Sequence, residues 1–405
     1  MKLIIQNRNY FQLIIFVLFL QADFCYAQTD TIQTGADQTE LYVPLLQGKN
    51  VGMVINQTSV IGSSKVLSAD SLLKMGIKIS KIFGPEHGFR GNASNGAKVN
   101  DAIDAKTGLP IISLYGKHYK PSAEDMKNID VMVYDIQDVG ARFYTYINTL
   151  ADVMEACAEN GKELIILDRP NPNAYVDGPV LDMKQKSGIG KFPIPITHGM
   201  TIGEFAQMIN GEGWLPNKMQ CKIKVITVKN YDHDMDYTLP VNPSPNLNTQ
   251  QSILLYPSLC LFEGTIISQG RGTEMPFTVL GNPDLKGMYD FSFTPVSIPG
   301  KSETPLHQNQ VCYGLDLRNY NAEKLHKSGK INIKWMIDLY QAYPYKGKFF
   351  DRTQSKQMGN IDYLAGTTSF KEQIIAGKSE KEIRKSWEPG LSQYKKMRKK
   401  YLLYK

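Results

Sequence analysis

Five short apolar runs in this sequence each end in a cluster of polar and charged residues, and this pattern limits the folds open to the chain. Short, β-branched apolar runs are typical of strands buried on both faces of a parallel sheet. In open α/β sheets, ligands bind outside the carboxyl ends of such strands. The sequence therefore predicts a parallel sheet whose carboxyl edge carries a functional site. The runs are Val51–Ile55, Ile77–Phe83, Ile111–Leu114, Val131–Tyr134 and Leu164–Leu167.

Helical patterns separate these runs. The longest covers Phe143–Asn160, and a capping box of Thr201 and Glu204 opens another helix. Lys222–Val228 supplies a sixth strand. Because strands spaced by helices favour a parallel, doubly wound sheet, we expect a Rossmann-like α/β domain over residues 48–241.

The proline-rich stretch Asn242–Asn248 predicts turns and marks the start of a second unit. Helical runs and less regular strands follow it, and the last expected helix covers Ser379–Trp387. We expect residues 242–405 to form a smaller α+β C-terminal domain that closes a cleft. At 405 residues, the chain is long enough for two packed cores.

Residues 1–27 have the pattern of a signal peptide. Lys2 and Arg8 form its basic region, Phe11–Leu20 its apolar core, and small residues precede a cleavage point after Ala27. The apolar core is too short for a permanent membrane span, and no later segment is apolar for long enough. We expect an exported protein, periplasmic or secreted, without stable membrane insertion.

Cys25 raises the alternative of a lipoprotein, which Asp23 and Phe24 before it disfavour. Residues 28–47 are expected to be a loose lead-in. The formal charge is +7, and much of the excess lies in the basic block Lys395–Lys400. Such a block usually forms one solvated helix face, and no nucleic-acid-reading motif accompanies it, so no nucleic-acid partner is expected.

No cofactor or metal motif is present. Asn56 to Thr58 follow the first strand where a dinucleotide-binding protein would have glycines, and no phosphate loop, nucleophile elbow or zinc motif appears. The cysteines of the mature chain lack metal-site spacing, and whether one pair forms a disulfide stays open. These cysteines are Cys157, Cys221, Cys260 and Cys312. We expect neither cofactor nor metal.

Glu86 is the first candidate for chemistry, in a loop that directly follows a buried strand. Phe83, Pro85 and Phe89 around it would desolvate the carboxyl and raise its pKa, as a general acid at neutral pH requires. The alternative is a solvated glutamate paired with Arg90.

Two more clusters follow neighbouring strands. Asp135 is a candidate second carboxylate, with Asp138, Arg142 and Tyr144 beside it as candidate substrate-binding residues. Asp138 and Arg142 can instead pair and hold their loop in shape.

Asp168 and Asn171 lie in a proline-stiffened loop that suits hydroxyl or amide recognition, unless Asp168 braces Arg169. His198 either donates to a substrate or satisfies a loop carbonyl.

The second unit adds Glu263, Glu274 and Arg271. Arg271 lies between two glycines, and its planar fork suits a carboxylate ligand. The alternative is a salt bridge to Glu274 across a turn.

The sequence strongly resembles the exo-β-N-acetylmuramidase family, glycoside hydrolase family 171, formerly a domain of unknown function. The resemblance covers nearly the whole mature chain and rests on long, specific stretches. These are residues 84–88, 135–146, 168–172, 245–247, 263–265 and 270–273.

The resemblance implies release of N-acetylmuramic acid from the non-reducing ends of peptidoglycan fragments, in a cleft between a Rossmann-like and a smaller domain. The glutamate of the family's Glu-His-Gly motif maps onto Glu86 as catalytic acid. His87 and Asn246, both in matching stretches, are candidate substrate-binding residues. The implied partners are peptidoglycan-derived saccharides.

Glycoside cleavage needs a proton donor and a second group on the opposite side of the sugar. Asp135, Glu263, Glu274 and the substrate's own acetamide stay open for that second role. Arg271, Arg142 or Arg90 is the candidate clamp for the lactyl carboxylate of muramic acid. The alternative to an enzyme is a periplasmic binding protein for cell-wall saccharides that lacks turnover. The oligomeric state and the stereochemical outcome are not predicted.

Overall fold

The computed structural model describes residues 31–86, 88–90, 102–116, 118–351 and 360–405. The expected signal peptide and His87 lie outside the described residues. Residues 33–405 form one compact unit. No helix in the described part of the chain is long and apolar enough to cross a membrane.

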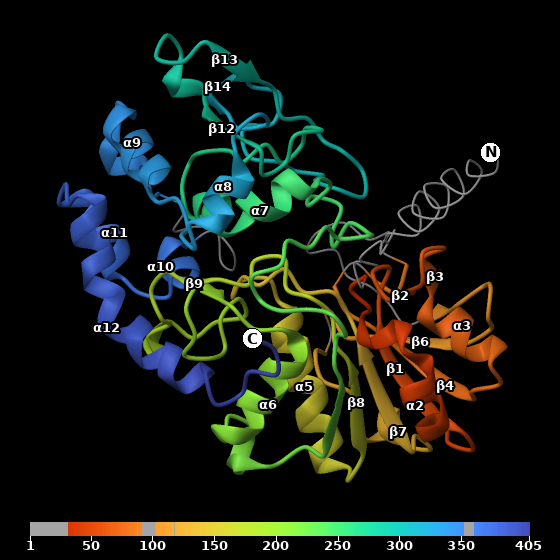
Figure 1. The fold of residues 1–405 in the computed structure, drawn as a ribbon. Coiled ribbons are helices and arrows are strands. Elements are labelled where there is room, and N and C mark those ends of the chain that lie inside the picture. Colours follow the sequence, from red (N-terminus) through yellow and green to blue (C-terminus); the bar gives the residue numbers. More distant parts are fainter. Residues whose placement is uncertain (1–30, 87, 91–101, 117, 352–359) are drawn as a thin grey trace, which may run out of the picture. The chain divides into compact units, whose positions relative to one another are not determined.

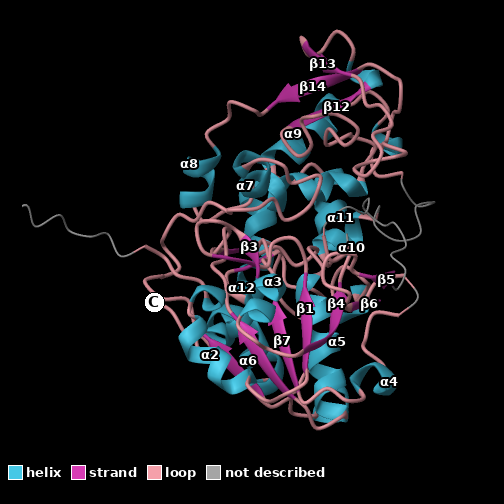
Figure 2. Cartoon of the chain, turned by 90° about the vertical axis from the view of Figure 1, so that its right-hand side faces the viewer, coloured by secondary structure: helices cyan, strands magenta, loops and turns pink. Residues whose placement is uncertain are grey.

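A seven-stranded sheet dominates the N-terminal half, in the order β11-β8-β7-β1-β4-β6-β5. Every neighbouring pair is parallel except β5 with β6. Figure 2 shows β7, β1, β4 and β6 side by side. The strands are β1 (Val51–Ile55), β4 (Ile79–Gly84), β5 (Ala102–Ile103), β6 (Pro110–Ser113), β7 (Val131–Asp135), β8 (Glu163–Leu167) and β11 (Ile223–Ile226).

The sheet confirms the predicted doubly wound fold. The chain builds β1, β4 and β6 outward on one side, then returns to add β7, β8 and β11 on the other. The direction reverses between β1 and β7, and ligands of such folds bind at this switch point. Candidate residues that follow β4 and β7 therefore lie on either side of it.

Helices cover both faces of the sheet. Side chains of β7 alternate between two cores: Met132 and Tyr134 pack with α5 and α6, whereas Val131 and Val133 pack with α2 and α3. This alternation explains why the strand is apolar throughout. The helices are α2 (Thr39–Leu46), α3 (Ser68–Lys74), α4 (Ala123–Met126), α5 (Tyr146–Glu159) and α6 (Ile202–Gly211).

The lead-in is more ordered than expected. Within residues 28–47, α2 buries Tyr42 and Leu46 completely. Gly35 fits against the backbone of β8 and β11 so closely that a Cβ atom there would meet Ile226 and Asp168. The expectation of a loose segment is therefore wrong, because a few apolar side chains and one glycine dock the segment onto the sheet.

In the described residues, the C-terminal half contains a small antiparallel sheet in the order β12-β14-β13 and six α-helices (Figure 1). This arrangement confirms an α/β fold with a second, smaller part. The division at residue 242 stays a prediction. The strands are β12 (Val279–Asn282), β13 (Phe291–Phe293) and β14 (Cys312–Asp316), and the helices are α7 (Gln250–Leu259), α8 (Ala322–Lys327), α9 (Lys334–Ala342), α10 (Ile361–Ala365), α11 (Ser369–Ile375) and α12 (Glu380–Arg398). Two short hairpins, β2 (Val60–Ile61) with β3 (Val66–Leu67) and β9 (Val176–Asp177) with β10 (Thr197–His198), complete the strands of the described residues.

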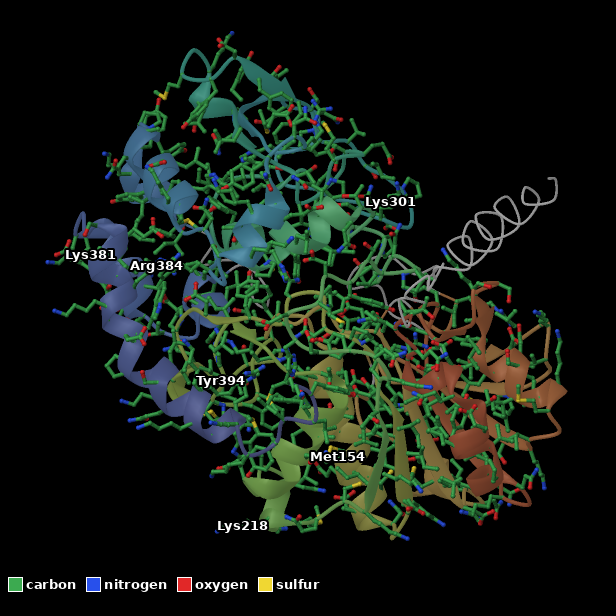
Figure 3. All side chains as sticks on the ribbon, viewed as in Figure 1. Met154, Lys218, Lys301, Lys381, Arg384 and Tyr394 are labelled. Atoms are coloured by element: carbon green, nitrogen blue, oxygen red, sulfur yellow. The ribbon has the colours of Figure 1, made fainter. Side chains whose placement is uncertain are left out.

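Helix α12 is longer than expected and runs through Pro389 to Arg398. Its buried residues repeat at helical spacing, so packing outweighs the local cost of proline. In Figure 3, Lys381 points away from the unit, whereas Arg384 and Tyr394 point inward. The buried residues are Ile383, Trp387, Leu391 and Tyr394. Four cysteines at positions 157, 221, 260 and 312 are free and buried.

Candidate active site

One cavity brings four candidate residues together, Tyr144 among them, and we call it cavity A. Glu86 reaches it from the loop after β4, and Glu263 and Arg271 reach it from the C-terminal half. The space within it is about 560 Å³, open solvent included. The other lining residues are Phe143, Tyr144, Thr145, Tyr146, Ile189, Ser244, Leu247, Tyr256, Cys260, Phe277 and Leu364.

The surroundings of Glu86 are hydroxyl-rich. The Thr145 hydroxyl lies 3.5 Å from Oε2 of Glu86, and the Tyr146 hydroxyl lies 3.5 Å from its carbonyl oxygen. Burial raises the pKa of Tyr115, and the nearby charge of Glu86 and a hydrogen bond to its carboxyl raise it further. Tyr115 therefore keeps its proton and donates to that carboxyl.

The apolar residues expected around Glu86 lie elsewhere. Phe83 packs in the core beneath α5, and Phe89 packs in the core on the opposite face of the sheet. Arg90 pairs with Asp104 at 2.7 Å, not with Glu86. The alternative of a salt bridge between Glu86 and Arg90 is wrong, because the guanidinium turns to the buried carboxylate of Asp104.

Glu263 and Arg271 form an ion pair that borders cavity A. Nε and Nη2 of Arg271 lie 2.8 and 2.7 Å from Oε1 of Glu263. The guanidinium also lies over the ring of Phe277, 4.9 Å from its centroid. Burial opposes the charge of Arg271, but Glu263 raises its pKa above the ordinary value, so it stays a cation.

The alternative for Arg271, a salt bridge to Glu274, is wrong. Glu274 instead pairs with Lys301 at 2.9 Å, and its side chain is 74% exposed. Lys301 is labelled in Figure 3. Glu274 does not line cavity A.

An aromatic wall connects the two acidic sides of cavity A. Tyr146 contacts Tyr144 at 4.9 Å between ring centroids, Tyr144 contacts Tyr256 at 5.8 Å, and Tyr256 contacts Phe277 at 5.0 Å. The Tyr144 hydroxyl donates to the carbonyl of Pro243, which fixes the ring. Of these residues only Tyr144 was a sequence candidate. Tyr256 and Phe277 belong to apolar stretches that do not distinguish a cavity wall from a core.

Asp135 lies within the protein framework instead. It is fully buried, and its carboxylate pairs with Arg169 at 2.7 Å. Arg169 also donates to the carbonyl of Val60, which ties β7 to the neighbouring β2. Asp135, a sequence candidate for the second catalytic carboxylate, is thus paired with a structural partner.

Asp138 and Arg142 do not form the expected pair. Asp138 accepts a hydrogen bond from the amide of Gly140 and lies 3.5 Å from His198. Arg142 runs in another direction, is fully buried and donates to the carbonyls of Pro179, Ile194 and Leu364. Burial lowers the pKa of Arg142 to about 9.

The side chain of Asp168 holds the C-terminus of the chain. Arg169 contacts this side chain through its backbone amide and not through its guanidinium. Its carboxylate accepts hydrogen bonds from Thr201, the amide of Gly203 and the Tyr404 hydroxyl. Burial raises the pKa of Asp168 to about 6.

The remaining candidates also bond within the protein. The Asn171 side chain donates to the carbonyl of Met200, and that of Asn246 donates to the carbonyl of Lys301. Nδ1 of His198 accepts from the amide of Met200. None of these three side chains lines cavity A. The described residues contain no cluster of three or more groups able to hold a metal ion.

A second cavity adjoins the first, and we call it cavity B. Glu86, Thr145 and Ile189 line both. Cavity B also includes Tyr115 and Tyr119. Glu86 therefore lies at the boundary between two adjoining spaces.

A doubly wound sheet with two carboxylates in a cavity beside its switch point defines an α/β enzyme of the glycoside hydrolase class. Models of the N-terminal and C-terminal parts of exo-β-N-acetylmuramidase NamZ match residues 51–251 and 254–404. The chain is 41% identical over 398 residues to the peptidoglycan β-N-acetylmuramidase NamZ of Bacillus subtilis (strain 168), covering 93% of this chain and 92% of that protein. This chain belongs to the exo-β-N-acetylmuramidase NamZ family.

Two crystal structures of DUF1343 family proteins from Bacteroides fragilis NCTC 9343 resemble this fold. The first is 46% identical with a TM-score of 0.84, and covers 93% of this chain and 99% of that one. The second is 30% identical with a TM-score of 0.78, and covers 92% and 99%. The fold, second part included, is therefore that of the family.

Proposed function

We propose that this protein is an exported exo-β-N-acetylmuramidase that releases N-acetylmuramic acid from the non-reducing ends of peptidoglycan fragments. The observation that carries this proposal is the position of Glu86 between cavities A and B. A general acid must reach the oxygen that joins the released sugar to the leaving chain. Glu86 has this position if the released sugar occupies cavity A and the leaving chain occupies cavity B.

The contents of cavity A fit a terminal muramic acid. Arg271 stays positively charged. Of the three candidate arginines, it is the one that lines cavity A, so we assign it to the lactyl carboxylate. The aromatic wall offers apolar ring faces to the sugar.

Glu86 and Glu263 take distinct roles in the proposed reaction. Glu86 donates its proton to the glycosidic oxygen as the bond to the anomeric carbon breaks. Glu263 is the second group and stabilises the positive charge that develops on the sugar ring. Asp135 and Glu274 do not line cavity A, whereas Glu263 does, so neither supports this role as well.

Substitution of Glu86 tests the role of the acid. The variant Glu86→Gln should cleave a disaccharide of muramic acid and N-acetylglucosamine about 10³-fold more slowly than wild type. A chromogenic aryl muramide should lose less, because an activated leaving group needs little protonation. Glu263→Gln should slow both substrates, because charge develops on the sugar in either case.

The matched control is Glu274→Gln, which makes the same chemical change at an exposed glutamate. Its rates on both substrates should equal those of wild type. Wild-type cleavage of the disaccharide by Glu86→Gln would exclude the proposed acid. Retention of intact disaccharide by the wild-type protein, without released sugar, would instead support a binding protein without turnover.

If Arg271 binds the lactyl carboxylate, its substitution should reduce the preference of the enzyme for muramides. Muramides and N-acetylglucosaminides differ by the lactyl ether alone, so the clamp should favour the muramide. Arg271→Met should reduce the preference for aryl muramide over aryl N-acetylglucosaminide roughly 10- to 100-fold, as expected for a charged hydrogen bond. An unchanged preference would exclude the clamp.

Export is proposed from the N-terminal sequence alone. Expression of the full chain in a bacterial host should yield a mature protein that begins at Gln28, by mass spectrometry of its N-terminal peptide. A retained leader, or a lipid-modified N-terminus at Cys25, would contradict the proposed cleavage.

A further inference from the structure

Cavity B continues into a third space, and we call it cavity C. Asp152 and Lys191 line both. Cavities B and C contain about 850 and 710 Å³ of space, open solvent included. The remaining residues of cavity C include Glu155, Lys186, Phe192 and Trp214. Cavities A, B and C therefore follow one another without a break in their lining residues.

One face of α5 forms the floor of this track. Thr145, Thr149, Asp152 and Glu155 are half-buried and spaced three or four residues apart, so they lie on one side of the helix. The opposite side of α5 packs in the core. From residue 145 to residue 155 the helix rises about 15 Å, which exceeds the length of a single sugar ring.

A buried hydrogen-bond acceptor points to a ligand in cavity B. Asn148 is 4% exposed and donates through Nδ2 to the carbonyl of Gly188. Its Oδ1 accepts no hydrogen bond from the described residues. An unsatisfied acceptor at this depth is costly, so a donor from a bound molecule would stabilise it. Sugar hydroxyls and acetamide N–H groups are such donors.

Cavity C combines an aromatic surface with an exposed cation. Trp214 stacks on Phe192 with 5.2 Å between ring centroids, which fixes the indole. Lys191 pairs with Asp152 at 2.6 Å at the boundary with cavity B. Lys186 is exposed at the far end. Aromatic faces and charged side chains together suit a sugar that carries an anionic group.

We infer that the track along α5 binds the leaving chain, with one sugar in cavity B and a second muramoyl sugar in cavity C. This inference rests on the proposed function, because Glu86 defines which side of the cleaved bond the track holds. Muramoyl sugars alternate with N-acetylglucosamine in peptidoglycan, so in a glycan chain without stem peptides the sugar after next carries a free lactyl carboxylate. Asn148 accepts from the sugar in cavity B, and Lys186 pairs with the carboxylate in cavity C.

Three substrates of increasing length test this arrangement. An aryl muramide occupies cavity A with a small leaving group, a disaccharide adds the sugar of cavity B, and a tetrasaccharide of alternating sugars adds that of cavity C. Wild-type enzyme should show a higher kcat/KM for the tetrasaccharide than for the disaccharide. Equal values would overturn the assignment of cavity C.

Two variants separate the cavities. Asn148→Ala should lower the ratio of kcat/KM for disaccharide over aryl muramide by about tenfold, the upper range for one neutral hydrogen bond. Lys186→Glu should lower the ratio for tetrasaccharide over disaccharide by about fivefold, as expected for a partly screened ion pair. Both ratios compare substrates on one enzyme sample, so any loss of folded protein cancels.

Lys184→Glu is the matched control, because Lys184 is exposed two residues away and does not line cavity C. Its ratios should equal those of wild type. A tetrasaccharide whose third sugar has its carboxylate reduced to an alcohol should erase the effect of Lys186→Glu. Equal effects of the two lysine variants, or a ratio unchanged in Asn148→Ala, would overturn the inference. A wild-type enzyme inactive on all three substrates would instead reject the proposed function.

Discussion

Two groups of charged residues lie near the carboxyl edge of the same sheet, and they differ in what their side chains bind. The framework group bonds almost entirely to other parts of the protein and comprises Asp135, Asp138, Arg142, Asp168 and Arg169. The cavity group borders open space and comprises Glu86, Glu263 and Arg271. Both groups include residue types that glycosidases use, so residue type and strand position alone do not separate them.

The two groups therefore have different roles along the carboxyl edge of the sheet. Loops after β7 and β8 carry the framework group, which fixes those loops and the C-terminus. The loop after β4 and the C-terminal half carry the cavity group. A substrate placed between them meets rigid walls, because the walls are held by buried pairs and not by the substrate. Preorganisation of this kind favours binding of a transition state.

The buried pair of Asp135 and Arg169 should give the largest effect on stability. Both side chains are at most 2% exposed, so Asp135→Ala leaves a buried cation without its partner. We expect a loss of roughly 3–5 kcal/mol in the free energy of unfolding, measured by urea denaturation. Glu274→Ala, which removes an exposed partner of Lys301, should lose less than roughly 0.5 kcal/mol. Similar losses in both variants would remove the distinction between the groups.

Much of the fold was predictable from the sequence. The periodicity of the apolar runs located β1, β4, β6, β7, β8 and β11 of the large sheet but not the two-residue β5, and the capping box at Thr201 located the start of α6. Helix α5 begins at Tyr146, three residues later than expected, because Phe143 to Thr145 line cavity A before the helix starts. Helix α12 was underestimated because Pro389 and Gly390 resemble a stop signal that buried contacts override.

The site was predictable only in part. Glu86, Glu263, Arg271 and Tyr144 were sequence candidates and line cavity A. The direction of a side chain after a strand was not predictable, and that direction commits Asp135 to Arg169. Asn148 had no signal in the sequence, because one asparagine in a helix does not reveal an unsatisfied oxygen.

Asp168 should make a pH-dependent contribution to the free energy of unfolding. Burial raises its pKa from 3.8 to about 6, so the folded protein binds this proton more tightly than the unfolded chain does. The contribution is fully present below about pH 4 and is lost as the pH rises through 6, a change of about 3 kcal/mol. The comparison is the free energy of unfolding of wild type and Asp168→Asn at pH 4, 5, 6 and 7.

The difference between the two proteins isolates Asp168, since every other residue is the same in both. Wild type should lose stability relative to the variant as the pH rises. A constant difference between pH 4 and pH 7 would show that the carboxyl of Asp168 keeps an ordinary pKa.

Substitution of Tyr394 should have the smallest effect on the free energy of unfolding, and it tests whether the framework group extends to α12. This residue of α12 is buried, and its hydroxyl donates to the carbonyl of His198 at 2.8 Å, near the framework residue Asp138. Tyr394→Phe should lose about 1 kcal/mol of unfolding free energy, because a buried carbonyl loses its donor. Tyr345→Phe is the control, since Tyr345 is 56% exposed and its hydroxyl makes no hydrogen bond to the described residues. If the two variants have equal stability, the Tyr394 hydroxyl contributes nothing to the free energy of unfolding, and the framework group does not extend to α12.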